Sequence, residues 1–281
     1  MNIQNHLETK GYTKVNNFIS DKTITNIINQ WQLIQEDPSA DLRNEKFIKE
    51  PVVSVYVHKL NGKKKLLPLS SLPSILSVLN SINFKNLFNE LSLHNNKITL
   101  LETIIFDKPP KVSGDLHWHQ DTSYFPLLPL IPSKLWFITF WIALDDIDEE
   151  NGAMQYFENS HSLGELASVD LNTGLKYRDD DDRLPISDIK INDKKVFSGI
   201  VNRGDVLIHN GLTLHKSLKN ISLNRNRRAL AFKFLLGDIL FKPRPGISNL
   251  FIAEKKFIED EKFESICYPK YENDNFLINK F

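Results

Sequence analysis

The strongest constraint on the fold is a series of short apolar segments, rich in β-branched residues, between residues 97 and 236. The segment 135–144 is almost continuously apolar, as expected for a strand that is covered on both faces. Pro, Gly and Asn turn signals separate the segments. Strands are predicted at 97–106, 135–144, 154–157, 204–209 and 228–236. Many short strands separated by turns predict a β-sandwich or a barrel.

Two helical patterns precede these strands. Ser20, a residue type that caps helix N-termini, is followed by apolar residues at helical spacing up to Ile34, and Pro38 ends the pattern. The second pattern covers 72–93, and a strand is expected at 52–58. A short extended segment is expected before the first helix.

The predicted elements favour one domain over residues 1–281. We expect a helical cover with edge strands at 1–95, a β core at 96–240 and a C-terminal extension at 241–281.

Charge and cysteine content exclude several classes of protein. The chain has 35 basic and 35 acidic residues, so its zero net charge gives no long-range attraction to nucleic acid or to an anionic membrane. No apolar run approaches the ~20 residues of a membrane span, and the N-terminus is too polar for a secretion signal. With Cys267 as the single cysteine, we expect a cytoplasmic protein without nucleic-acid or membrane partners. The sequence does not indicate an oligomeric state.

A candidate metal site begins in LHWHQDTSYFP, residues 116–126, with the pattern His119-x-Asp121. In extended backbone, residues two apart point to the same face, so this imidazole and this carboxylate can bind one metal ion. His209 and His215, in GDVLIHNGLTLHKS, are the candidates for a third ligand. Two histidines and one carboxylate are the ligand set of non-haem Fe(II) oxygenases, and they leave positions open for a co-substrate and O₂.

A candidate carboxylate site follows in the chain. The co-substrate 2-oxoglutarate has a far carboxylate for which a buried arginine is the best partner, and Arg227 lies twelve residues after His215. A hairpin turn through 220–226 is expected to bring the strand 228–236 beside the strand that carries His215. Ser217, on the same face as His215, can donate to the same carboxylate.

Three blocks of the sequence resemble the phytanoyl-CoA dioxygenase (PhyH) family of Fe(II)/2-oxoglutarate oxygenases. They are LHWHQDTSYFP, WIALDDIDEENGAMQYFENSH and GDVLIHNGLTLHKSLKNIS…RRA, and they occur in the family's order between residues 102 and 234. The pattern GYTKVNNFISDKTITNII is similar to the family's opening strand and helix. The resemblance implies a mainly β fold with flanking helices, whose core is a double-stranded β-helix, or jelly roll.

The resemblance also implies which residues bind iron. His119 and Asp121 match the first two ligands and His215 matches the third, which leaves His209 as a rival ligand or a buried histidine. Related halogenating enzymes have a small residue in place of the carboxylate, so Asp121 favours hydroxylation. His161 is interpreted as structural.

For 2-oxoglutarate, the resemblance implies Ser217 and Arg227. The spacing from His215 to Arg227 is one residue longer than the family pattern, so Arg228 and Arg225 remain alternatives.

The resemblance implies an enzyme, a hydroxylase that uses Fe(II), 2-oxoglutarate and O₂ and releases succinate and CO₂. Glu102, Tyr124, Phe125 and Trp141 are expected to line its substrate pocket. No segment resembles a CoA site, and the neutral chain offers no basic rim for CoA phosphates. We therefore expect a small metabolite as the substrate, such as a natural-product biosynthetic intermediate.

Two other classes of protein remain open. A cupin-type metalloenzyme that does not use 2-oxoglutarate would not need Arg227, and a non-catalytic binding jelly roll would tolerate His119→Ala. The segment 172–195, with four acidic residues at 179–182, is expected to be a solvated loop or a lid. As a lid, its acidic residues would suit a cationic substrate.

Overall fold

A computed structural model describes residues 2–36, 52–53, 55–60, 63–93, 96–111, 116–166, 195–242, 259–263, 270–272 and 275–277. The acidic residues 179–182, Cys267 and most of the C-terminal extension lie outside these ranges. The helical elements are α1 (Ile3–Lys10), α2 (Asp21–Glu36), η2 (Leu69–Ser71), α3 (Pro73–Leu79), α4 (Ile82–Glu90), η3 (Asp121–Tyr124) and η4 (Ser160–Leu163). The strands are β1 (Tyr12–Val15), β2 (Val52–Val53), β3 (Val55–Leu60), β4 (Lys63–Pro68), β5 (Ile98–Lys108), β6 (Leu116–His119), β7 (Leu127–Pro129), β8 (Phe137–Ala143), β9 (Met154–Phe157), β10 (Val196–Gly199), β11 (Val206–Asn210), β12 (His215–Ser217), β13 (Arg227–Leu236), β14 (Ile239–Phe241), β15 (Lys270–Glu272) and β16 (Asn275–Leu277).

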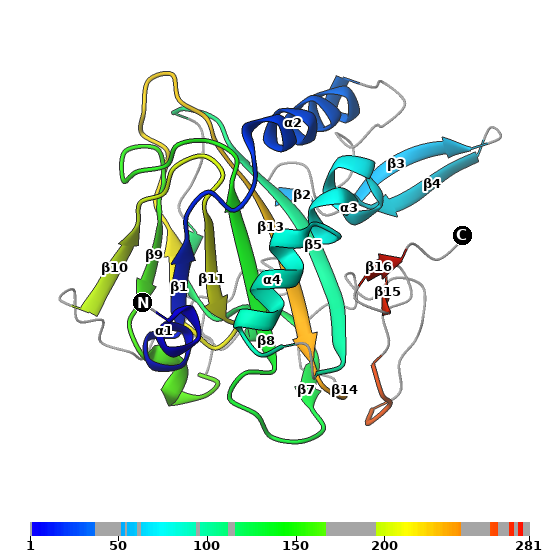
Figure 1. Cartoon of the computed structure of the whole chain (residues 1–281). Helices are drawn as coiled ribbons and strands as arrows, with labels where there is room; N and C mark the ends of the chain where they lie inside the picture. The colour runs from blue at the N-terminus through cyan, green and yellow to red at the C-terminus, as the bar shows by residue number, and fades with distance from the viewer. Residues whose placement is uncertain are drawn as a thin grey trace, which may run out of the picture.

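Two antiparallel sheets form the core (Figure 1). The larger sheet has the strand order β1-β11-β8-β13-β5-β15-β16, with β2 also paired to β5, and the smaller has the order β10-β9-β12-β6. Apolar residues of both sheets pack together, among them Trp141 and Ala231 of the larger sheet and Tyr156 of the smaller. The predicted mainly β fold with flanking helices is confirmed, and all five predicted strands between 97 and 236 are present as β5, β8, β9, β11 and β13.

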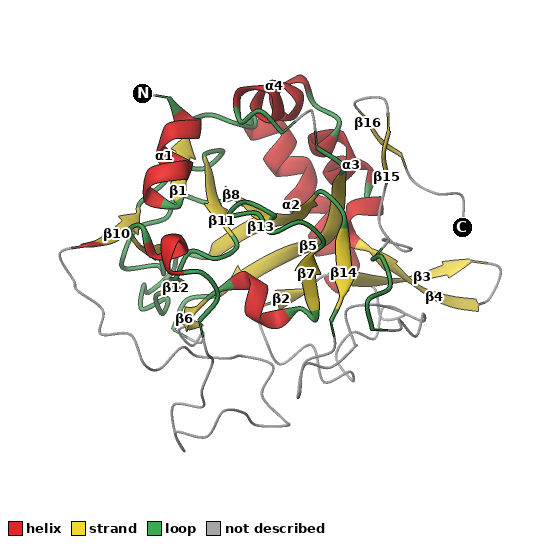
Figure 2. Cartoon of the chain, turned by 90° about the horizontal axis from the view of Figure 1, so that it is seen from below, coloured by secondary structure: helices red, strands yellow, loops and turns green. Residues whose placement is uncertain are grey.

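Helices cover the other face of the larger sheet. Figure 2 shows α2, α3 and α4 on one side of this sheet and β6 and β12 on the opposite side. Phe84 of α4 packs on Phe140 and Phe232, with ring centroids 5.2 and 5.6 Å apart. Each phenylalanine buried in this way stabilises the fold by about 1.5–3 kcal/mol relative to an exposed one. The helices therefore hold β8 and β13 in place from outside and leave their inner face for the site.

Two local predictions were incomplete. The extended segment expected before the first helical pattern is present as β1, but the helix α1 that precedes it was not predicted. Leu7 is the only buried residue of α1, so no apolar stripe marked this helix in the sequence. Asn2 caps this helix by accepting hydrogen bonds from two backbone amides of the first turn. The single helical pattern expected at 72–93 is instead two helices. The first, α3, ends at Leu79, and the side chain of Ser81 caps the start of α4 by accepting a hydrogen bond from the backbone amide of Phe84 at 3.3 Å.

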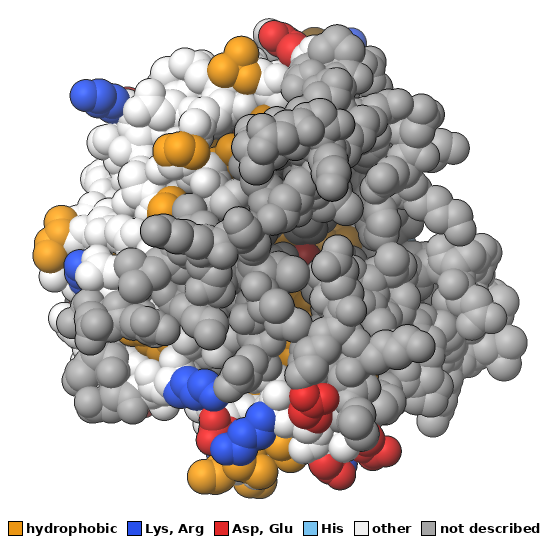
Figure 3. Space-filling model, turned by 90° about the vertical axis from the view of Figure 1, so that its right-hand side faces the viewer, with side chains coloured by type: hydrophobic (Ala, Val, Ile, Leu, Met, Phe, Trp, Pro, Cys, Tyr) orange, Lys and Arg blue, Asp and Glu red, His pale blue; other side chains and the backbone are white. Residues whose placement is uncertain are grey.

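The surface charges are mixed in sign. On the face shown in Figure 3, basic and acidic side chains lie intermixed along the lower edge. Exposed ion pairs of described residues join Lys97 and Lys262 to Asp238, and Lys242 to Asp260. Among the described helices, none is long and apolar enough to cross a membrane.

Candidate metal centre and adjoining carboxylate site

Three buried side chains meet between the two sheets. His119 ends β6 and lies directly opposite His215 of β12 in the antiparallel register of the smaller sheet. Gln120 has extended backbone, so Asp121 shares the side of His119 before the chain turns into η3. One ligand atom from each of His119, Asp121 and His215 lies within 4.8 Å of the others. Each of the three residues is only 3% exposed.

Both histidines present the same ring nitrogen to this point. His119 Nδ1 lies 2.7 Å from the carbonyl oxygen of His117, and His215 Nδ1 lies 2.9 Å from that of Thr213. A carbonyl only accepts, so Nδ1 carries the hydrogen and Nε2 keeps its lone pair. Burial lowers the pKa of His119 to about 4 and the pKa of His215 well below its ordinary value. At neutral pH both rings are therefore uncharged and able to bind a metal ion.

The carboxylate of Asp121 is ionised and held on both oxygens. Burial raises its pKa, but Lys233 and the two nearby histidines His215 and His209 lower it further, so that it lies well below the ordinary value. Oδ2 accepts from Thr139 Oγ1 at 2.6 Å and from His209 Nε2 at 3.0 Å, while Oδ1 lies 3.1 Å from Lys233 Nζ. Because His209 uses Nε2 to hold the carboxylate, it lies outside the group of three. Two neutral imidazoles and one carboxylate fit a divalent iron.

Arg227 reaches the site from the larger sheet, and the predicted hairpin was wrong. The strand β13 pairs with β5 and β8, whereas β12 belongs to the smaller sheet. The chain therefore crosses between the sheets at 218–226 instead of turning back within one. Strand alternation predicts which residues share a face, but it does not say which sheet a strand joins.

The guanidinium of Arg227 is almost completely buried and only partly paired. The residue is 1% exposed, its Nε donates to the Gly152 carbonyl at 3.1 Å, and its Cζ lies 5.5 Å from the Trp141 ring centroid. Its Nη1 has no hydrogen-bond partner among the described residues. Burial lowers the pKa of Arg227 to about 9, which still leaves the group charged at neutral pH. A buried cation with a free donor fits the carboxylate of an anionic ligand.

Ser217 and a lysine that sequence reasoning missed lie next to this arginine. Lys108 is directly opposite Arg227 in the register of β5 and β13. Its Nζ donates to Ser217 Oγ at 2.8 Å and to the Leu218 carbonyl at 3.0 Å, which leaves the Ser217 hydroxyl hydrogen available to a ligand. Strand alternation could have indicated Lys108, because Ile104, Phe106 and Lys108 lie on the same face of β5.

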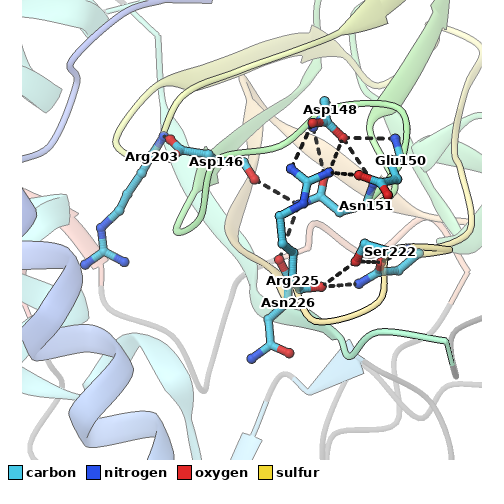
Figure 4. A network of polar contacts seen from close by, with 9 residues as sticks. Asp146, Asp148, Glu150, Asn151, Arg203, Ser222, Arg225 and Asn226 are labelled. Atoms are coloured by element: carbon cyan, nitrogen blue, oxygen red, sulfur yellow. Dashed lines mark hydrogen bonds and ion pairs between the residues drawn. The ribbon is translucent and has the colours of Figure 1, made fainter.

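The two alternative arginines pair with carboxylates away from this inner face. Arg225 binds Asp148 through two hydrogen bonds of 2.8 and 2.9 Å and also contacts Glu150 (Figure 4). Arg228 Nη2 lies 2.6 Å from Asp145 Oδ1. Only Arg227 among the three arginines points between the sheets with a free donor. The 2-oxoglutarate role of Arg227 stays a prediction.

The turn before Arg227 is fixed by side-chain amides. Asn151 Nδ2 donates to the carbonyls of Asp146 and Asn226, at 2.8 and 3.3 Å (Figure 4). The next residue, Gly152, has φ +103°, and a Cβ there would lie 2.8 Å from the Leu218 carbonyl oxygen. Glycine is therefore required where the Arg227 guanidinium meets this backbone.

Comparison with known proteins identifies the family. The family model of phytanoyl-CoA dioxygenase (PhyH) matches residues 7–229. The chain belongs to the PhyH family. A PhyH domain-containing protein 1 homologue of Dictyostelium discoideum is 27% identical over 158 residues, 54% of this chain and 51% of that protein. A probable alpha-ketoglutarate-dependent hypophosphite dioxygenase of Stutzerimonas stutzeri is 27% identical over 237 residues, 78% of this chain and 72% of that protein. The chain spans about half the length of the first curated relatives it matches.

Solved structures share the fold of this PhyH chain. The non-haem alpha-ketoglutarate-dependent epimerase SnoN from nogalamycin biosynthesis has a TM-score of 0.64 and 16% identity, covering 95% of this chain and 94% of SnoN. The carbocyclase SnoK from the same biosynthesis has a TM-score of 0.63 and 19% identity, covering 93% of this chain and 92% of SnoK. The predicted jelly-roll core is thereby confirmed.

Three of the four predicted substrate-pocket residues of this PhyH protein surround a second buried lysine, Lys233. Its Nζ lies 3.5 Å from Glu102 Oε2, and 6.0 and 5.3 Å from the ring centroids of Tyr124 and Phe125. The fourth, Trp141, lies instead against Arg227. Sequence reasoning missed Lys233, although it shares the inner strand face of Arg227 at even spacing.

Proposed function

We propose that this PhyH-family chain is an Fe(II)/2-oxoglutarate-dependent dioxygenase that hydroxylates a C–H bond of a small metabolite and releases succinate and CO₂. The observation that carries the proposal is the pairing of two buried features. One is the His119, Asp121 and His215 group, and the other is the Arg227 guanidinium with its free donor. A cupin-type metalloenzyme without 2-oxoglutarate would use only the first feature, and a binding jelly roll would need neither.

The residues of the first feature would hold the metal in a prepared state. His119 and His215 offer Nε2 from neutral rings that their own strands orient. Thr139 and His209 fix one oxygen of the Asp121 carboxylate, so that the other oxygen faces the histidines. When bound, Fe(II) supplies the chemistry that couples O₂ to the decarboxylation of 2-oxoglutarate and the oxidation of the substrate.

The residues of the second feature would bind the far carboxylate of 2-oxoglutarate. Arg227 supplies a permanent charge in a buried place where charge-assisted hydrogen bonds are strong. Ser217 adds a hydroxyl donor, and Lys108 adds a second cation on the neighbouring strand. Trp141 packs under the guanidinium and keeps water from that side.

The relatives support a small-molecule substrate. The Stutzerimonas relative is named for hypophosphite, and SnoN and SnoK come from the biosynthesis of nogalamycin, a natural product. We propose a biosynthetic intermediate or a similar small metabolite for this chain, and hydroxylation as the outcome because Asp121 keeps the carboxylate ligand.

The test is succinate and CO₂ release from 2-oxoglutarate under air, with and without Fe(II). We expect iron-dependent turnover in the wild type and its loss in His215→Ala and Arg227→Ala. Arg228→Ala is the matched control, because Arg228 pairs with Asp145 on the opposite strand face, and it should keep most of the turnover. Turnover that survives Arg227→Ala, or no turnover and no binding of iron or 2-oxoglutarate, would contradict the proposal.

A further inference from the structure

Four polar side chains cross the inner face of the larger sheet in register. His209 of β11 pairs with Thr139 of β8, Thr139 pairs with Lys233 of β13, and Lys233 pairs with Glu102 of β5. All four are buried. We call these four residues the polar row.

The residues beside the polar row are apolar. On one side the aligned residues are Leu207, Trp141, Ala231 and Ile104, and on the other side Phe137 and Leu235 pair. The neighbouring rows show that this face of the sheet packs well with apolar residues, so packing alone does not require charged residues in the polar row. Replacing a buried ion pair by apolar residues of similar size is often neutral or stabilising, so stability alone does not explain Lys233 and Glu102. The register of β13 and β5 also shifts directly after Lys233, and such bulges re-aim side chains near active sites.

Three members of the polar row contact the Asp121 carboxylate, and of these only Lys233 contacts the oxygen that faces His215. Asp121 Oδ2 accepts hydrogen bonds from Thr139 and His209. Oδ1 lies 3.9 Å from His215 Nε2 and 3.1 Å from Lys233 Nζ. The ammonium therefore contacts the carboxylate oxygen that lies near His215, which is the oxygen that would bind a metal ion held by His215 Nε2. Glu102 Oε2, 3.5 Å from the same Nζ, is the neighbouring acceptor.

We propose that Lys233 competes with the metal ion for Asp121 Oδ1, and that Glu102 accepts the ammonium when the metal is bound. The inference rests on the proposed function and makes Lys233 and Glu102 positioning residues that act through Asp121. An ammonium and a divalent cation on one buried oxygen repel each other strongly, because little water screens them. With Glu102 as the alternative acceptor, the ammonium can move away from the metal without losing a charged partner.

The test measures the Kd of Mn(II), used as a stand-in for Fe(II), by calorimetry on the full chain without 2-oxoglutarate. Lys233→Met removes the competing cation and should tighten Mn(II) binding by about tenfold. Glu102→Gln removes the second acceptor and should weaken binding by a similar factor. In the double variant the Glu102→Gln effect should largely disappear, because it acts through Lys233.

A matched control removes a lysine from another buried carboxylate. Lys14 Nζ lies 3.2 Å from Asp205 Oδ2 on the edge of the same sheet. Lys14→Met should leave the Kd unchanged, and thermal unfolding of each variant checks that it folds. If Lys233→Met does not fold, the Glu102→Gln variant alone still tests the inference, because the inference predicts that its Kd for Mn(II) rises.

Equal Mn(II) affinity in all variants, or weaker binding in Lys233→Met, would overturn the inference while leaving the proposed function intact. No Mn(II) binding by the folded wild type would overturn both.

Discussion

Each metal-site histidine is oriented by its own strand. His119 and His215 both donate Nδ1–H to the carbonyl two residues earlier, so the ring orientation depends on local backbone and not on a distant partner. The His119-x-Asp121 pattern was predicted from strand alternation, whereas the choice of His215 over His209 was implied by the family resemblance. The carboxylate of Asp121 differs, because its partners come from β8, β11 and β13.

Thr139→Val should weaken Mn(II) binding by about tenfold, because the Thr139 hydroxyl holds Asp121 Oδ2 at 2.6 Å. The change keeps the side-chain shape, and calorimetry measures the Kd. Thr103→Val is the matched control, since the buried Thr103 hydroxyl has no hydrogen-bond partner among the described residues. An unchanged Kd in Thr139→Val would show that this hydroxyl does not prepare the site.

Arg227→Met should have opposite effects on binding and on stability. The affinity of the Mn(II)-loaded protein for 2-oxoglutarate should fall by about 10- to 100-fold, because hydrogen bonds to a charged group contribute about 1.5–3 kcal/mol. The ligand-free protein should gain about 1 kcal/mol in its free energy of unfolding, because a buried, unsatisfied donor is removed. Calorimetry and denaturant unfolding measure the two quantities, and a loss of stability with unchanged 2-oxoglutarate affinity would make Arg227 a structural residue.

Between elements, the register of strand pairing determines which side chains meet, whereas alternation along one strand shows only which side chains share a face. Alternation along β13 places Arg227 and Lys233 on one face, but the contacts of Lys233 with Glu102 and Asp121 depend on the pairing of β13 with β5. This pairing joins residues more than a hundred positions apart, and no local pattern encodes it. Lys108 was missed for the same reason. The longer strands were predictable, whereas short strands such as β7, β10 and β14 were not predicted, and neither was the sheet that each strand joins.

The loop that leads into β13 carries a prediction of its own. Asp148 binds Arg225 through two hydrogen bonds, and it also accepts hydrogen bonds from the backbone amides of Glu150 and Asn151 (Figure 4). Asp148→Ala should loosen this loop and raise the KM for 2-oxoglutarate by about three- to tenfold through misplacement of Arg227.

In the same variant the Mn(II) Kd should not change, because the three metal-site residues lie on other elements. Asp238→Ala is the control, since Asp238 also pairs with two basic side chains on the surface. A parallel loss of Mn(II) affinity in Asp148→Ala would mean that the loop supports the whole site and not the arginine alone.

For the whole molecule, the order of strand and helix patterns was enough to predict a β core with a helical cover. The long apolar run that forms β8 has all seven residues buried, because helices cover one face and the smaller sheet covers the other. The helix α1 was missed because it has one buried residue and is identified by its caps alone. The jelly roll was implied by family resemblance and not by periodicity, which fits sandwiches and barrels equally.

The same architecture explains why the two parts of the site meet. The smaller sheet supplies both histidines, and the larger sheet supplies Arg227 and the polar row. Iron and 2-oxoglutarate should therefore bind as one unit in the space between the sheets.

The most direct test of this claim is visible absorption of the protein without O₂, titrated with Fe(II) and 2-oxoglutarate. A charge-transfer band should form only when both are present, because it requires 2-oxoglutarate on the bound iron. It should be absent in His215→Ala and should need much more 2-oxoglutarate in Arg227→Met. A folded wild-type protein that shows no band at saturating Fe(II) and 2-oxoglutarate would contradict the account.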